Sequence, residues 1–139
     1  GFLVKLDTNG THPKTLKDLI DNNLLDYIAM DIKNSLKQYP ETCGVLSVNI
    51  NTIIESINIL KDNNVPYEFR TTLVAEYHSE ESVEELGELI QGSERLFLQK
   101  FVDREGVIKK GLHEVPFEIA TKFQRILQKF VKHVDFRGY

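Results

Sequence analysis

Two charged side chains, Asp31 and Lys33, follow a short apolar run that is typical of a buried β-strand. Because they are two positions apart on a strand, they share one face. The carboxylate can accept hydrogen bonds from hydroxyl groups, and the ammonium can pair with an anion. The pair therefore suits a ligand that carries both hydroxyls and a carboxylate, such as a ribose joined to an amino acid. Taken alone, the pair is better explained as a structural ion pair that caps a strand, because charged strand ends are common.

Polar residues also follow the other predicted strands. The sequence Asp-Thr-Asn at residues 7–9 follows an apolar run and leads into Gly10, a pattern typical of a turn. Arg70 lies near the end of an aromatic and β-branched run, and Gln99 and Lys100 lie near the end of another. In a parallel sheet these strand ends meet at one edge, where α/β proteins place their chemistry.

The segments that must position these residues alternate between short apolar runs typical of strands and apolar residues at helical spacing. This alternation predicts an α/β fold with a parallel sheet and alternating helices. The apolar strands are expected to be buried on both faces. Periodicity alone leaves two architectures open, a doubly wound sheet and an incomplete barrel. The predicted strands are 2–6, 25–32, 67–74, 95–102 and a short final one within 131–136; the predicted helices begin near Pro13, Ile50, Ser82 and Pro116.

Composition limits the function classes. With 139 residues, 41% hydrophobic and 27% charged, the chain is expected to form one globular domain, residues 1–139. The net charge of −4 and the scattered Lys and Arg give no nucleic-acid-binding surface. No apolar run approaches the roughly 20 residues that cross a membrane. The single cysteine, Cys43, excludes an internal disulfide and indicates a reduced, cytoplasmic setting.

The two strand-end motifs together resemble the middle of the glycyl-radical-enzyme activating enzymes of the radical SAM superfamily. The matching residues are Leu6-Asp7-Thr8-Asn9-Gly10-Thr11 and Met30-Asp31-Ile32-Lys33, with Arg70, Leu98-Gln99-Lys100-Phe101 and the final Phe136-Arg137-Gly138-Tyr139 in place. The resemblance covers nearly the whole chain and is nearest to the anaerobic ribonucleoside-triphosphate reductase activating proteins and the pyruvate formate-lyase activating enzymes. It implies the C-terminal part of a partial (β/α)6 TIM-like barrel.

The resemblance also implies a cofactor site. Asp31 would bind the ribose hydroxyls of S-adenosylmethionine, Lys33 the ribose or the methionyl carboxylate, and Ile32 would add backbone contacts. The same resemblance places further residues in this cavity, namely Asp7, Thr8 and Asn9 beside the methionine moiety and Arg70 deeper in. It further implies a glycyl radical enzyme as partner and an electron donor such as flavodoxin or ferredoxin.

The family's CxxxCxxC loop, which holds a [4Fe–4S] cluster, is missing from the sequence, as is its Gly-Gly-Glu segment. One thiol cannot hold such a cluster. The chain is therefore expected to be a C-terminal fragment that lacks the first βα units, inactive alone, although its parent cleaves S-adenosylmethionine to generate a glycyl radical. Loss of those units would expose a sheet edge, which favours a homodimer.

Two alternatives remain open. One is a barrel lyase that uses Lys33 as a Schiff-base nucleophile, although an adjacent carboxylate favours the charged amine over the neutral one that this chemistry needs. The other is a non-enzymatic α/β binding module. A CxxxCxxC sequence upstream in the parent gene would distinguish an activating enzyme from such a module.

Overall fold

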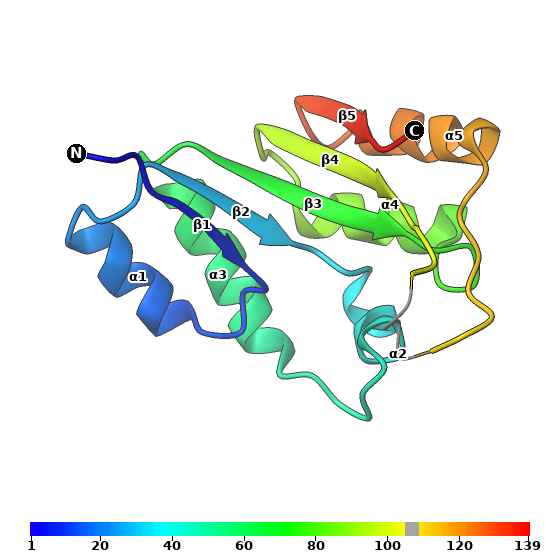
Figure 1. Cartoon of the computed structure of the whole chain (residues 1–139), viewed down its shortest axis with the longest axis horizontal. Helices are drawn as coiled ribbons and strands as arrows, with labels where there is room; N and C mark the ends of the chain where they lie inside the picture. Colours follow the sequence, from blue (N-terminus) through cyan, green and yellow to red (C-terminus); the bar gives the residue numbers. More distant parts are fainter. Residues whose placement is uncertain (105–108) are drawn as a thin grey trace.

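The protein contains one five-stranded sheet in the computed structural model, which describes residues 1–104 and 109–139. The strands lie in the order β1-β2-β3-β4-β5, and every neighbouring pair is parallel (Figure 1). The strands are β1 (Lys5–Thr8), β2 (Tyr27–Asp31), β3 (Tyr67–Leu73), β4 (Arg95–Lys100) and β5 (His133–Arg137). The helices are α1 (Pro13–Asp21), the 3-10 turn η1 (Leu36–Gln38), α2 (Tyr39–Cys43), α3 (Ile50–Asp62), α4 (Glu80–Leu89) and α5 (Phe117–Leu127). The predicted α/β class with a parallel sheet is confirmed.

The four long helices pack on one face of the sheet. Strands in sequential order, joined by right-handed crossovers, place every connecting helix on the same side. Figure 1 shows α1 and α3 beside the β1–β2 half of the sheet and α4 and α5 beside the other half. Within each half the two helices contact each other, α1 with α3 and α4 with α5. A single core forms between helices and sheet; its strand residues all point to this face and are Ile28, Met30, Phe69, Leu73, Leu96, Leu98 and Val134.

The opposite face of the sheet is polar and is not covered by any helix of the described chain. Its residues alternate with those of the core, so Asp31 of β2 lies beside Arg70 of β3, and Thr72 of β3 lies beside Gln99 of β4. The expectation that the strands are buried on both faces is therefore wrong for this face. The sheet presents a row of charged and amide side chains instead, and these include the residues with candidate chemistry.

The start of α4 differs from the sequence prediction. Ser82 and Glu85 have the spacing of a capping box, but Ser82 is already the third residue of the helix, which begins at Glu80. Ser79 is its N-cap: its hydroxyl accepts a hydrogen bond from the backbone N–H of Ser82, and its own N–H donates to the Ser82 hydroxyl. Two serines at the same spacing as Ser82 and Glu85 therefore form the box, and the glutamate lies within the helix.

Gly87 of α4 lets this helix lie directly against the ring of Phe130. A Cβ atom at this position would lie 2.3 Å from Phe130 Cδ2. Alanine normally stabilises a helix by about 1 kcal/mol relative to glycine, but here overpacking opposes that gain. We expect Gly87→Ala to lower the free energy of unfolding by about 1 kcal/mol, as measured by urea denaturation. In a Phe130→Leu background, which removes the ring, the same change should become stabilising.

Candidate functional site

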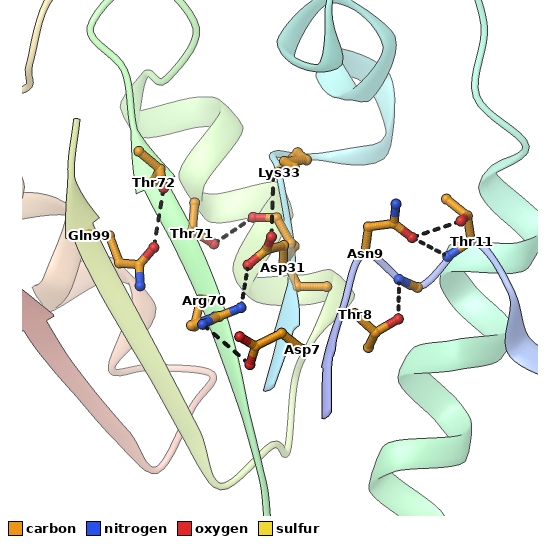
Figure 2. Close-up of polar contacts among 12 residues, drawn as sticks. Asp7, Thr8, Asn9, Thr11, Asp31, Lys33, Arg70, Thr71, Thr72 and Gln99 are labelled. Carbon is orange, nitrogen blue, oxygen red and sulfur yellow. Dashed lines mark hydrogen bonds and ion pairs between the residues drawn. The ribbon is translucent and has the colours of Figure 1, made fainter. Parts of the chain in front are cut away.

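Four charged side chains meet at the carboxyl-terminal edge of the sheet, on its uncovered face (Figure 2). We call Asp7, Asp31, Lys33 and Arg70 the strand-end cluster. Arg70 lies between the two carboxylates, with Nη2 3.2 Å from Asp31 Oδ1 and Nη1 3.7 Å from Asp7 Oδ1. Lys33 Nζ lies 3.6 Å from Asp31 Oδ2. Positive and negative groups thus alternate across three strands, and the structure brings together four of the seven candidate residues.

The cluster is open to solvent on the side away from the helices. The side chain of Arg70 is 15% exposed and that of Asp31 is 34% exposed, whereas those of Lys33 and Asp7 are 42% and 61% exposed. Ion pairs at such distances and exposures contribute little to stability, typically below about 1 kcal/mol. Each carboxylate also has about four acceptor positions, of which the cations use only some. The cluster can therefore accept hydroxyl donors and an anionic group from a ligand at little cost.

The backbone that carries Asp31 and Lys33 is held from the helix side by buried polar side chains. The Ile32 N–H donates to the Arg70 carbonyl at 2.8 Å, and the Ile32 carbonyl accepts from the Thr71 hydroxyl at 2.7 Å. The Tyr39 hydroxyl accepts from the Lys33 N–H at 3.2 Å. Burial raises the pKa of Tyr39 to about 12, so this hydroxyl stays protonated at neutral pH. The Ile32 side chain is fully buried, and both of its backbone polar groups are bonded within the chain.

The turn after β1 uses its polar side chains internally. The Thr8 hydroxyl accepts from the Gly10 N–H at 3.1 Å, and Asn9 Oδ1 accepts from the Thr11 N–H at 3.0 Å (Figure 2). The Gly10 carbonyl accepts from the buried Ser56 hydroxyl of α3 at 2.7 Å. Thr8 and Asn9 therefore shape the turn that fixes the end of β1, and they do not lie in the strand-end cluster with Asp7.

Sequence reasoning missed the side chains that brace this edge from behind. Thr71, Tyr39 and His78 are buried, and each bonds a backbone group between Asp31 and Lys33. No motif marks them, because they come from three different elements. The one available signal was Thr71 itself, a polar residue on the face of β3 that otherwise carries Tyr67, Phe69 and Leu73.

A well-formed groove of the surface lies away from these groups. It is a groove of about 530 Å³ between α1 and α3, with an apolar floor that includes Ile20, Ile54 and Ile59 and with scattered charges at its rim. It lies on the helical side of the sheet, and charged residues that line it, such as Lys17, Asp21 and Glu55, belong to the exposed faces of α1 and α3. Chemistry therefore favours the strand-end cluster as the functional site, although that edge is the less hollow of the two.

The described residues contain no group of three side chains suited to a metal ion. Cys43 is exposed at the end of α2, but partial burial of its sulfur still raises the pKa of the thiol, which disfavours the thiolate. Residues 1–104 and 109–139 also contain no helix that is both long and apolar enough to cross a membrane. The one metal-binding function that the sequence suggested, an iron–sulfur cluster, cannot be assembled from ligands of this chain.

Comparison with known proteins agrees with the two strand-end motifs. The chain is 38% identical over 138 residues, 97% of its length, to a protein of Methanocaldococcus jannaschii named "Putative glycyl-radical enzyme activating enzyme", and it spans 57% of that relative. A solved domain of the pyruvate-formate lyase-activating enzyme from Bacteroides vulgatus has the same fold, with a TM-score of 0.75 and 16% identity over 99% of this chain and 83% of that one. No protein-family model matches the chain. The resemblance inferred from the sequence is confirmed: this chain is related, over almost all of its residues, to a glycyl-radical enzyme activating enzyme.

Proposed function

We propose that this chain forms the S-adenosylmethionine-binding edge of a radical SAM activating enzyme, whose iron–sulfur ligands lie elsewhere in the parent protein. The observation that carries the proposal is the strand-end cluster, with two carboxylates, a guanidinium and an ammonium at one edge of a parallel sheet. The M. jannaschii relative is named "Putative glycyl-radical enzyme activating enzyme", and the chain matches it over 97% of its own length. Both features support the same ligand.

The cluster fits S-adenosylmethionine group by group. The ligand offers a vicinal diol, whose hydroxyls can donate hydrogen bonds to a carboxylate, and it offers a carboxylate of its own, which cations can bind. Asp31 would accept hydrogen bonds from the ribose hydroxyls, and Lys33 would bind the ribose or the methionyl carboxylate. Asp7 would face the methionine moiety, while Arg70 would keep both carboxylates in place from its less exposed position. Thr8, Asn9 and Ile32 would contribute through the backbone geometry that they fix.

The residues of this chain do not fit the [4Fe–4S] cluster, because Cys43 is the single cysteine. The chain spans 57% of its M. jannaschii relative, which leaves room in a parent protein for three thiolate ligands. In the parent protein such a cluster would supply the electron for reductive cleavage of S-adenosylmethionine. This chain would bind and orient the substrate, so we propose that residues 1–139 are one domain of a TIM-like barrel and are inactive alone.

The parent enzyme would abstract a hydrogen atom from a glycine of a partner enzyme, of the anaerobic ribonucleotide reductase or pyruvate formate-lyase type. Its reductant would be a flavodoxin or a ferredoxin, and its compartment the cytoplasm. The name of the M. jannaschii relative supports a glycyl radical partner. Phe2 and Leu3, just before the edge strand β1, are 98% and 88% exposed, which supports self-association of the isolated chain at this edge.

Anaerobic calorimetric titration of the intact protein with S-adenosylmethionine tests the ligand. We expect Lys33→Met to weaken binding about tenfold, because a charge-assisted contact contributes about 1.5 kcal/mol. Lys37→Met is the matched control. Lys37 is an exposed lysine four positions after Lys33, so the change removes the same charge outside the strand-end cluster and should leave the affinity unchanged. The proposal is wrong if the unaltered protein does not bind or if the two variants bind alike.

A further inference from the structure

Beyond β2 the chain leaves the sheet, and its backbone groups need other partners. Three successive carbonyls, those of Asp31, Ile32 and Lys33, each accept a hydrogen bond from a side chain of a different element. The donors are the Tyr39 hydroxyl at 3.4 Å, the Thr71 hydroxyl at 2.7 Å and His78 Nε2 at 2.9 Å. These contacts lie behind the segment, whereas the charged side chains of Asp31 and Lys33 lie in the strand-end cluster in front.

His78 connects two loops that are far apart in sequence. It lies in the loop between β3 and α4, is 6% exposed, and reaches the Lys33 carbonyl 45 positions away. A carbonyl only accepts, so Nε2 must carry the proton. Burial lowers the pKa of His78, so the ring is neutral at pH 7 and Nδ1 is left as an acceptor. The Val74 N–H, 3.0 Å from Nδ1, supplies the matching donor. The Val74 carbonyl also lies 3.2 Å from Nδ1, but it accepts from the backbone N–H of His78 at 3.0 Å and needs no proton from the ring.

The two ring nitrogens of His78 therefore bind different parts of the chain. The Nδ1 contact is local and closes the turn that follows β3, between residues four positions apart. The Nε2 contact runs between loops and fixes the carbonyl of Lys33 itself. A second bond joins the same two loops: Asn34 Nδ2 donates to the Tyr77 carbonyl at 2.7 Å, and Asn34 is fully buried. The loop after β3 thus holds the backbone at the point where the Lys33 side chain begins.

We propose that His78 is a positioning residue, whose Nε2–H bond to the Lys33 carbonyl sets the direction in which Lys33 and Asp31 face a bound nucleoside with a carboxylate. The inference rests on the proposed function, because the ligand is S-adenosylmethionine. Without this bond the Lys33 carbonyl would be left without its buried partner, and the segment would move to reach another donor. The ammonium at its end would then no longer be held beside Asp31.

Two substitutions separate the two roles of the ring in the intact protein. Gln places an amide N–H where Nε2 lies, so His78→Gln keeps the bond to Lys33 and gives up the Val74 contact. Asn places an amide oxygen where Nδ1 lies, so His78→Asn keeps the Val74 contact and gives up the bond to Lys33. Calorimetric titration with S-adenosylmethionine and thermal unfolding are measured on both variants and on the unaltered protein.

We expect the His78→Asn variant to bind about tenfold more weakly and the His78→Gln variant to bind within about threefold of the unaltered protein, although both unfold at lower temperature. Equal affinities for the two variants, or losses that follow only the loss of stability, would overturn the positioning role. If the unaltered protein does not bind S-adenosylmethionine at all, the proposed function is overturned instead. Failure of the proposed function is therefore seen in the unaltered protein, and failure of the positioning role is seen in the variants.

A measurement without any substitution guards against variants that fail to fold. The ¹⁵N chemical shifts of the His78 imidazole in the unaltered protein report which nitrogen carries the proton. We expect a protonated Nε2 and an unprotonated Nδ1 at pH 7, with and without S-adenosylmethionine. The opposite tautomer would remove the bond to Lys33 and with it the inference.

Discussion

Replacing Arg137 with methionine is expected to lower the free energy of unfolding by about 3 kcal/mol, because it leaves the buried Glu68 carboxylate without its charged partner. Arg137 of β5 reaches across β4 to Glu68 of β3, with Nη1 2.9 Å from Oε2 and Nη2 3.2 Å from Oε1. The Glu68 side chain is 3% exposed and that of Arg137 is 40% exposed. This half-open geometry places the loss at the lower end of the range for buried pairs.

The pair lies on the uncovered face of the sheet, where the guanidinium stacks on Phe97 with Cζ 3.7 Å from the ring centroid. Methionine keeps apolar cover over that ring, so the change mainly removes charge and hydrogen bonds. Urea denaturation or thermal unfolding measures the effect, which corresponds to a decrease in Tm of about 10 °C for a chain of this size. Arg125→Met, on the exposed side of α5, is the matched control and should cost less than about 0.5 kcal/mol.

A double variant identifies the cause. If an uncompensated charge is responsible, Glu68→Gln in the Arg137→Met background should recover about half of the lost stability, because a neutral amide is cheaper to bury than a carboxylate. Recovery of nothing would mean that Arg137 acts through its contact with Phe97 instead. The cycle is informative because the two residues lie 69 positions apart and share no local structure.

The sequence was sufficient to predict the order of the main strands and helices and the edge of the sheet at which the charged side chains meet. Strands and helices alternate with distinct periodicities, and that alternation makes parallel pairing and a common carboxyl-terminal edge unavoidable. Asp7, Asp31 and Arg70 therefore had to lie near one another once the sheet was parallel, and they do. Each of these residues reaches the edge of the sheet once its own strand is placed correctly, and no further loop contact is needed.

The uncovered face could not be predicted from hydrophobicity. Within β2 the run Ile28-Ala29-Met30 is continuously apolar, which is typical of a strand buried on both faces. Ala29 nevertheless points to the uncovered face and is buried because its side chain is small and its register neighbour is the longer Glu68. Which face carries helices depends on the order of the strands, and that order is a property of the whole chain.

The bracing side chains behind the site depend on distant contacts for a similar reason. His78 is one of four histidines, and nothing in its neighbours distinguishes it from His12 or His113, both of which are exposed. Its role arises because the loop after β3 folds back onto the end of β2, which brings it to the Lys33 carbonyl. Sequence identifies the residues that point toward a ligand more readily than those that hold the backbone behind them.

The turn after β1 gives the second large effect: Gly10→Ala is expected to lower the free energy of unfolding by about 3 kcal/mol. Gly10 has a φ of +77°, a left-handed conformation that costs an L-residue about 1–2 kcal/mol. In addition, a Cβ atom there would lie 2.1 Å from Cε of Met30, a fully buried side chain of β2. Overpacking of a core adds a further 1–3 kcal/mol.

Gly44→Ala separates these two causes. Gly44 has nearly the same φ, +72°, but a Cβ atom there would meet nothing within 4 Å. It should therefore show only the conformational cost, and the difference between the two variants in urea denaturation should be about 2 kcal/mol. If the two variants lose equal stability, Met30 moves aside freely and the close contact contributes nothing. If they differ as expected, packing against Met30 requires a glycine in the turn that follows Asp7, and the placement of the strand-end cluster depends on the core beneath it.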